Sequence, residues 1–152
     1  MIYAPIIMNA EVICYKGEWE NVKEVGVNQG REQEKTLAKK TYPQIEKFQD
    51  ITQKAILYML EDEQVDGIIQ DITKAAGISE YPSVPLTLED QVSYVMVVNK
   101  EFAETEAFTD FVNSYNKAVE KMNDLSYLSE KLNVDEEWLR EKDIKFLTIS
   151  ER

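Results

Sequence analysis

The sequence predicts an α/β fold with a mostly parallel sheet flanked by helices, followed by a C-terminal helical region. Two observations carry this prediction. Short strand-forming runs alternate with polar or amphipathic segments over residues 2–99, and such alternation is typical of β-α-β units. Over residues 105–145 the apolar residues recur at helical spacing instead. A chain of 152 residues also fits a single domain, which we expect to cover 1–152.

The first elements should form the core of the sheet. Residues 2–15 are rich in Ile, Val and Tyr and predict one or two strands, with Pro5 near a strand start or edge. Residues 23–28 predict a buried strand. The segment 31–40 places its acids first and its lysines last, which favours a helix because that order suits the helix dipole. A short strand is expected at 45–48.

The next elements repeat the pattern. Asp50, with Gln53 three residues later, is typical of a capping box and predicts the start of a helix. Residues 65–70 predict another buried strand. Asp71 should then begin a short helix that Gly77 ends.

The second half of the chain changes from strands to helices. A loop or edge strand is expected near 84–86, and the nearly continuous apolar run at 92–99 predicts a strand buried on both faces. Thr105 should cap a helix whose apolar stripe is typical of a protein core. Asp135 should cap the last helix, and 144–149 should form a closing strand or an extended tail.

Composition excludes several functions. The 29 acidic residues exceed the 17 basic ones and give a formal net charge of -12, which argues against binding to the phosphates of nucleic acids. The chain has no histidine, so His-based catalytic pairs and His-containing zinc sites are excluded. Its one cysteine, Cys14, cannot form an internal disulfide and should be a buried thiol.

The sequence predicts neither membrane insertion nor bound cofactors. Its apolar runs are shorter than the roughly 18 residues a spanning helix needs. The apolar start, residues 1–8, has no basic residue before it and makes a poor signal peptide, so we expect the chain to remain in the cytoplasm. No motif indicates a metal, a cofactor or a catalytic residue. The many carboxylates show no spacing that selects an acid–base pair, so we do not expect an enzyme.

Two polar groups follow predicted buried strands. Asn28, Gln29 and Gly30 lie between the strand at 23–28 and the next helix, where Gly30 could let the backbone approach an anion. From the residues alone, a purely structural turn is favoured over an anion site. Asp71 follows the next strand and could cap a helix, accept a hydrogen bond from a ligand, or do both. Small ligands bind at the carboxyl ends of strands in open α/β sheets.

Three stretches resemble one known family. Val25–Asn28 with the helix after it, Val65–Ala75, and Tyr94–Phe102 with the helix after it are similar to the C-terminal part of bacterial extracytoplasmic solute-binding proteins of ABC importers. The group that imports sulfonates, nitrate and thiamine-precursor pyrimidines is the most similar in character. This resemblance implies one lobe of a type II periplasmic-binding-protein-like fold, built from residues 22–86.

The resemblance also implies a function and a partner. Stretches 2–15 and 92–99 would be crossing strands, and Asn28, Gln29, Gly30 and Asp71 would face a small ligand, anionic or heteroaromatic. The family's N-terminal lobe and signal peptide have no counterpart in this sequence, although family members are extracytoplasmic. We therefore expect a homodimer or a separate complementary lobe. The alternative is an interaction or regulatory scaffold that has lost ligand binding.

Overall fold

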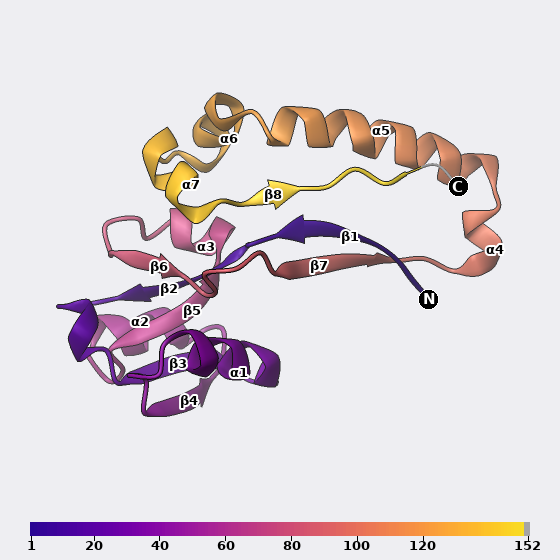
Figure 1. The fold of residues 1–152 in the computed structure, drawn as a ribbon. Coiled ribbons are helices and arrows are strands. Elements are labelled where there is room, and N and C mark those ends of the chain that lie inside the picture. Colours follow the sequence, from indigo (N-terminus) through magenta and orange to yellow (C-terminus); the bar gives the residue numbers. More distant parts are fainter. Residues whose placement is uncertain (151–152) are drawn as a thin grey trace. The chain divides into compact units, whose positions relative to one another are not determined.

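The fold is known from a computed structural model, which describes residues 1–150. The chain forms two compact units (Figure 1). Unit 1 contains residues 1–10 and the chain from Asp90 onward, and unit 2 contains Glu11–Glu89. Each unit has its own sheet and its own helices, and each is described separately below.

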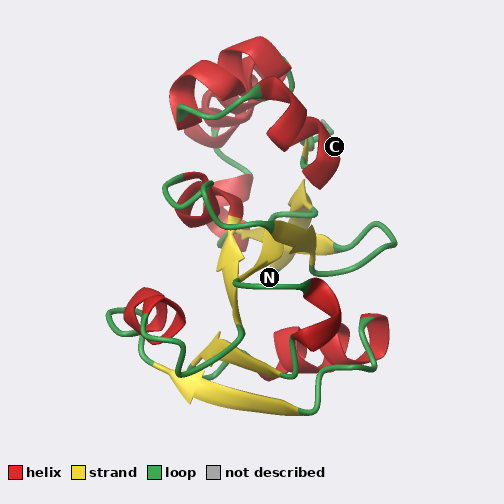
Figure 2. Ribbon diagram, turned by 90° about the vertical axis from the view of Figure 1, so that its left-hand side faces the viewer, coloured by secondary structure: helices red, strands yellow, loops and turns green. Residues whose placement is uncertain are grey.

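Unit 2 combines a five-stranded sheet with short helices. Its strands are β2 (Glu11–Tyr15), β3 (Glu24–Asn28), β4 (Lys47–Ile51), β5 (Gly67–Asp71) and β6 (Ser83–Pro85). Its helices are the 3-10 turn η1 (Trp19–Asn21), α1 (Glu32–Thr41), α2 (Ile56–Glu61) and α3 (Ile72–Ala76). Helices and strands alternate along this part of the chain (Figure 2), as the sequence predicts.

The sheet of unit 2 has the strand order β4-β3-β5-β2-β6. β3 runs parallel to both β4 and β5, while β2 runs antiparallel to β5 and β6. The α/β fold class is thereby confirmed. The parallel pairs arise where β-α-β units begin, from β3 onward. The strands outside those units pair antiparallel, so the sheet as a whole is mixed.

Side chains alternate between the two faces of this sheet. On one face a buried cluster joins Val25 and Val27 of β3 with Ala38 of α1. Gly26 points to the other face. A Cβ built there would lie 2.6 Å from Ile51 Cδ1 and 3.3 Å from Ile68 Cγ2. β3 is therefore enclosed on both faces, which explains why its sequence predicts a buried strand.

The predicted helix start at Asp50 is wrong. Asp50 lies inside β4, opposite Val27, and α2 begins only at Ile56. The predicted strand at 45–48 is correspondingly displaced to Lys47–Ile51. The reason is tertiary: pairing with β3 satisfies the backbone of this segment along five positions, and that ladder outweighs a local capping signal.

Unit 1 combines a three-stranded antiparallel sheet with helices. Its strands are β1 (Ile2–Met8), β7 (Val92–Val97) and β8 (Lys145–Phe146), in the order β7-β1-β8. Its helices are α4 (Lys100–Ala103), α5 (Glu106–Met122), α6 (Leu125–Leu132) and α7 (Glu136–Lys142). The closing strand expected near the C-terminus is present as β8. The predicted run 2–15 forms two strands, β1 and β2, which belong to different units.

The prediction that the strand at 92–99 is buried on both faces is wrong. β7 ends at Val97, lies at the edge of its sheet and exposes several apolar side chains, among them Val95 (43%) and Val97 (61%). An apolar run in the sequence is also compatible with an exposed strand face, because the run does not specify which elements cover each face of the strand. Asn99 instead caps the short helix α4, accepting from the backbone of Glu101.

The long helix α5 follows its predicted design. Thr105 Oγ1 accepts from the Phe108 backbone N–H at 3.2 Å and caps the helix start. Phe108, Val112 and Val119 are buried, which confirms the core interpretation of the apolar stripe. Phe108 also meets Tyr3 of β1 edge-on, with ring centroids 5.1 Å apart.

Candidate functional site

The loop after β3 presents open backbone at the carboxyl end of the strand. Gln29 N–H donates to Ile51 C=O and Arg31 N–H donates to Asn28 C=O, both at 3.2 Å. These bonds close a tight turn in which Gly30 has φ +84°. Nothing lies within 4 Å of a Cβ built on Gly30. Space is therefore available beside the backbone at this position, and glycine suits the positive φ.

Asp71 ends the neighbouring strand β5 and caps helix α3. Its Oδ1 accepts from the backbone N–H groups of Thr73 (3.0 Å) and Lys74 (3.1 Å), and from the Thr73 hydroxyl. Its Oδ2 lies 4.0 Å from Lys74 Nζ. The predicted capping role is confirmed. The cap bonds all fall on Oδ1, and the partly buried carboxylate keeps a second oxygen with acceptor capacity.

The parallel register brings these two groups together. Gly26 of β3 lies opposite Ile68 of β5. Continuing two positions along both strands sets Asn28 beside Gln70, and Asp71 follows directly. The four residues singled out in the sequence, Asn28, Gln29, Gly30 and Asp71, therefore lie at one edge of the sheet, where the carboxyl ends of β3 and β5 meet.

Two further carboxylates give this edge a negative character. Glu11 lies opposite Asp71 in the β2–β5 register. Glu34, on the first turn of α1, is partly buried. Burial raises the pKa of the Glu34 carboxyl, the Glu11 and Asp71 carboxylates raise it further, and the Arg31 guanidinium opposes them. A group that brings positive charge to this edge would relieve that mutual repulsion.

Helix α1 supplies the opposite polarity close by. It begins at Glu32, and its N-cap residue Arg31 makes no side-chain capping bond within the described structure. The N-terminus of such a helix attracts anions through its unpaired N–H groups and the helix dipole. The first turn of α1 also carries Glu32 and Glu34, whose carboxylates oppose a bound anion, so the Arg31 guanidinium is the group at this helix start that attracts one.

Sequence reasoning missed Glu11, Glu34 and Gln70. Glu11 comes from β2, a strand that precedes the β-α-β units in sequence and joins them only through the β2–β5 pairing. Glu34 looks like an ordinary helix residue. Gln70 was included in a predicted buried strand, and a polar residue at such a position is the one sequence signal that could have drawn attention to it.

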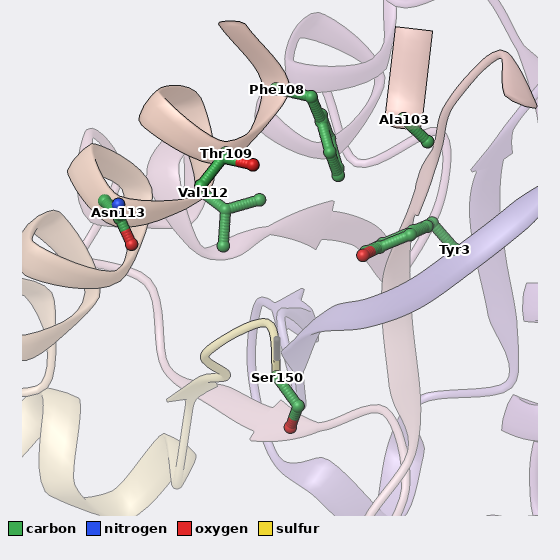
Figure 3. A pocket seen from close by; sticks show the side chains of 7 residues that line it. All are labelled: Tyr3, Ala103, Phe108, Thr109, Val112, Asn113 and Ser150. Carbon is green, nitrogen blue, oxygen red and sulfur yellow. The ribbon is translucent and has the colours of Figure 1, made fainter. Parts of the chain in front are cut away.

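Unit 1 holds a separate small pocket. It measures about 210 Å³ and is lined by Tyr3, Ala103, Phe108, Thr109, Val112, Asn113 and Ser150. The Tyr3 and Phe108 side chains point toward it (Figure 3). It is smaller than the roughly 300–1,000 Å³ of typical ligand sites, whereas a second pocket of unit 1, lined by residues 3–5 and 147–150, measures about 400 Å³. Among the described residues, neither pocket has a charged lining residue, so the edge of unit 2 is the stronger candidate for a charged ligand.

Two kinds of feature are absent from residues 1–150, the part of the chain that the structure describes. This part of the chain has no cluster of three or more His, Cys, Asp or Glu side chains placed to hold a metal ion. Within the same residues, no helix is long and apolar enough to cross a membrane.

Comparisons with known proteins address the fold. No family model matches the sequence, and no curated protein matches it. Solved structures do. A putative binding component of an ABC transporter from Wolinella succinogenes, complexed with lysine, matches with a TM-score of 0.55 and 16% identity, over 91% of this chain and 65% of that one.

Two further structures match at similar levels. The cysteine-binding protein of Campylobacter jejuni has a TM-score of 0.51 and 17% identity, over 90% of this chain and 60% of that one. The ancestral amino acid-binding protein AncCDT-1, a precursor of cyclohexadienyl dehydratase, has a TM-score of 0.51 and 17% identity, over 85% of this chain and 58% of that one. The neighbours are thus binding proteins, one of them an enzyme's precursor.

The similarity covers most of this chain but only about three-fifths of each neighbour. At such low identity it speaks for the fold. The chain has the α/β fold of one lobe of a periplasmic-binding-protein-like fold, which it shares with these binding proteins.

Proposed function

We propose that this chain binds a small zwitterionic solute, such as an amino acid, at the carboxyl ends of β3 and β5, without transforming it. The observation that carries the proposal is the convergence of the Asn28–Gly30 loop and Asp71 on one sheet edge. Ligands of open α/β sheets bind at such edges. The fold shared with amino-acid-binding proteins supports the same function, in relation to ABC import.

The charges around this edge favour a ligand with two opposite ends. The carboxylates of Glu11, Glu34 and Asp71 suit a ligand ammonium group, because each of them gains a counter-charge. The Arg31 guanidinium, beside the start of α1, suits a carboxylate. Sulfonates, nitrate and pyrimidines, which the family resemblance implies, would bring no positive charge to the carboxylates at this edge.

A thermal-shift screen tests the proposal directly. L-lysine, L-arginine, L-cysteine, taurine and nitrate form a suitable set. A ligand at a hundred times its Kd stabilises by about 2.7 kcal/mol. At about 2–4 °C per kcal/mol for a domain of this size, Tm should rise by about 5–11 °C. If no member of the set raises Tm, solute binding by the chain is refuted.

Gly30 offers a matched test of position. Gly30→Ala adds a methyl group at the proposed site, whereas Gly17→Ala adds one at a turn elsewhere. Both glycines have positive φ, +84° and +76°, and neither has a neighbour within 4 Å of a built Cβ. Both variants should lose similar stability through backbone strain, but only Gly30→Ala should weaken ligand binding. Equal ligand affinity in the two variants would place the site elsewhere.

Asp71→Asn separates the two roles of Asp71. Asparagine caps a helix about as well as aspartate, so the free energy of unfolding should change by less than about 1 kcal/mol. The negative charge is lost, so affinity for an amino-group ligand should fall by about tenfold or more, a change of at least about 1.4 kcal/mol. Isothermal titration calorimetry measures this. Unchanged affinity would remove Asp71 from the site.

The alternative function, an interaction scaffold, is favoured by one observation in unit 1. Among the described residues of this unit, seven large apolar side chains are more than a third exposed: Met1, Val92, Tyr94, Val95, Val97, Phe102 and Phe111. A homodimer would cover this surface. Size-exclusion chromatography with light scattering tests it: a dimer that Phe111→Ser dissociates supports the scaffold assembly, and a monomer at all concentrations contradicts it.

A further inference from the structure

Two buried polar atoms at the proposed edge have no hydrogen-bond partner. They are Asn28 Oδ1 and Gln70 Nε2, and the statement holds for residues 1–150, which the structure describes. Gln70 is only 4% exposed. Buried side-chain polar atoms are nearly always paired, with protein or with an ordered water. The two atoms therefore call for a bonding group that is not part of the described chain.

The two side chains are neighbours on one face of the sheet. Asn28 follows Gly26 by two positions on β3, and Gln70 follows Ile68 by two positions on β5. Side chains two positions apart share a face, and neighbouring strands are about 4.8 Å apart. The residues behind them on this face are apolar, since Ile51 and Ile68 close over Gly26. The polar pair therefore ends an apolar surface at the carboxyl edge.

The two unpaired atoms are chemically complementary. Asn28 Oδ1 is an acceptor and Gln70 Nε2 is a donor, yet they are not bonded to each other. We propose that they bind one hydroxyl-type group, which donates to Asn28 Oδ1 and accepts from Gln70 Nε2. That group is an ordered water or, if the proposed solute binding is correct, the hydroxyl of a bound ligand. Water and alcohols are the small neutral groups that do both.

A double-mutant cycle on the ligand-free chain tests the shared group. Asn28→Leu and Gln70→Met each remove one of the two partners of the shared group, so each should lower Tm by about 2–12 °C. The double variant leaves neither atom unpaired, and its loss should be smaller than the sum of the two single losses.

Gln49 provides the control for this cycle. It lies opposite Gly26 on β4, in the same sheet and on the same face, and none of its side-chain atoms is buried without a partner. Asn28→Leu combined with Gln49→Met should therefore lose the sum of its single losses. If the Asn28 and Gln70 substitutions are equally additive in the ligand-free chain, and L-serine binds no more tightly than L-alanine to the wild-type chain, no group is shared and the proposal is overturned.

Serine and alanine distinguish the two sources of the group, because they differ only by a hydroxyl. If a ligand hydroxyl occupies the position, the wild-type chain should bind L-serine about 3- to 10-fold more tightly than L-alanine. Gln70→Met should abolish the difference. If a water occupies the position between Asn28 and Gln70, the Asn28 and Gln70 substitutions remain non-additive, but the chain binds L-serine no more tightly than L-alanine. If neither amino acid binds, a serine hydroxyl is ruled out as the source, the thermal-shift screen still decides on solute binding, and the cycle still tests the water.

A crystal structure of the wild-type chain at high resolution needs no variant to fold. An oxygen within about 2.7–3.2 Å of both Asn28 Oδ1 and Gln70 Nε2 is the expected result. A direct bond between the two side chains, or the absence of such an oxygen from crystals grown both without ligand and with L-serine, would overturn the proposal.

Discussion

Substitution of Gly26 is the sharpest test of how β3 is held in place beneath the proposed site. A Cβ on Gly26 would lie 2.6 Å from Ile51 Cδ1, 3.3 Å from Ile68 Cγ2 and 3.6 Å from Val65 Cγ2. The first distance is shorter than real Cβ contacts, so Ile51 must change rotamer or β3 must shift. Ile51 is itself only 5% exposed, which leaves its side chain little room.

The expected cost follows from overpacking. Adding a methyl group to a filled core costs about 1–3 kcal/mol, so Gly26→Ala should lower Tm by about 2–12 °C at about 2–4 °C per kcal/mol. Ile51→Val removes the clashing Cδ1 atom and by itself costs about 0.5–1.5 kcal/mol. In Gly26→Ala/Ile51→Val the clash is relieved, so the double variant should lose less than the sum of its parts.

Urea denaturation followed by circular dichroism measures these differences. Gly77 is the matched control: it has φ -71° in the right-handed helical region, and the nearest atom to its built Cβ is Lys74 O at 3.4 Å. Gly77→Ala should therefore be neutral or stabilise by about 0.4–1 kcal/mol. The reasoning is refuted if Gly26→Ala unfolds at the wild-type urea midpoint, or if its cost simply adds to that of Ile51→Val.

Three further predictions concern charge and capping. Glu34→Gln should stabilise the chain at pH 7, because burial raises the pKa of Glu34. The protonated Glu34 carboxyl contributes its full stability below about pH 4.3, and this contribution is lost as the pH rises through the pKa of Glu34 in the folded chain. The higher urea midpoint of the variant should therefore disappear at low pH. Asp90→Asn should destabilise the chain at pH 7, because hydrogen bonds from Lys145 and, to a smaller extent, Asn9 lower the pKa of Asp90. The ionised Asp90 contributes this stability above about pH 3.9. Acid titration should show the free energies of unfolding of wild type and variant converging as the pH falls through the pKa of Asp90 in the folded chain. Thr105→Ala should cost about 1 kcal/mol in urea unfolding through loss of the α5 cap, and an unchanged midpoint would contradict the capping role.

The sequence predicted local elements well wherever one local signal decided them. Asp71 and Thr105 cap the helices that follow them, because a capping oxygen reaches N–H groups only two or three residues away. Sequence-based prediction failed at Asp50, where a similar capping signal competes with the β-ladder between β4 and β3. It failed again on the burial of β7, because apolar composition states a preference and the neighbouring elements decide whether it is met.

The candidate site shows the same division. The sequence alone placed Asn28, Gly30 and Asp71 at the ends of predicted buried strands. It could do so because strand ends and helix starts have characteristic local sequence patterns. Their meeting at one edge required the parallel β3–β5 register. The acidic character of that edge required the pairing of β2 with β5, which brings Glu11 opposite Asp71 from sixty residues away. Such contacts depend on long-range strand order, which no local pattern specifies, and only the tertiary structure decided them.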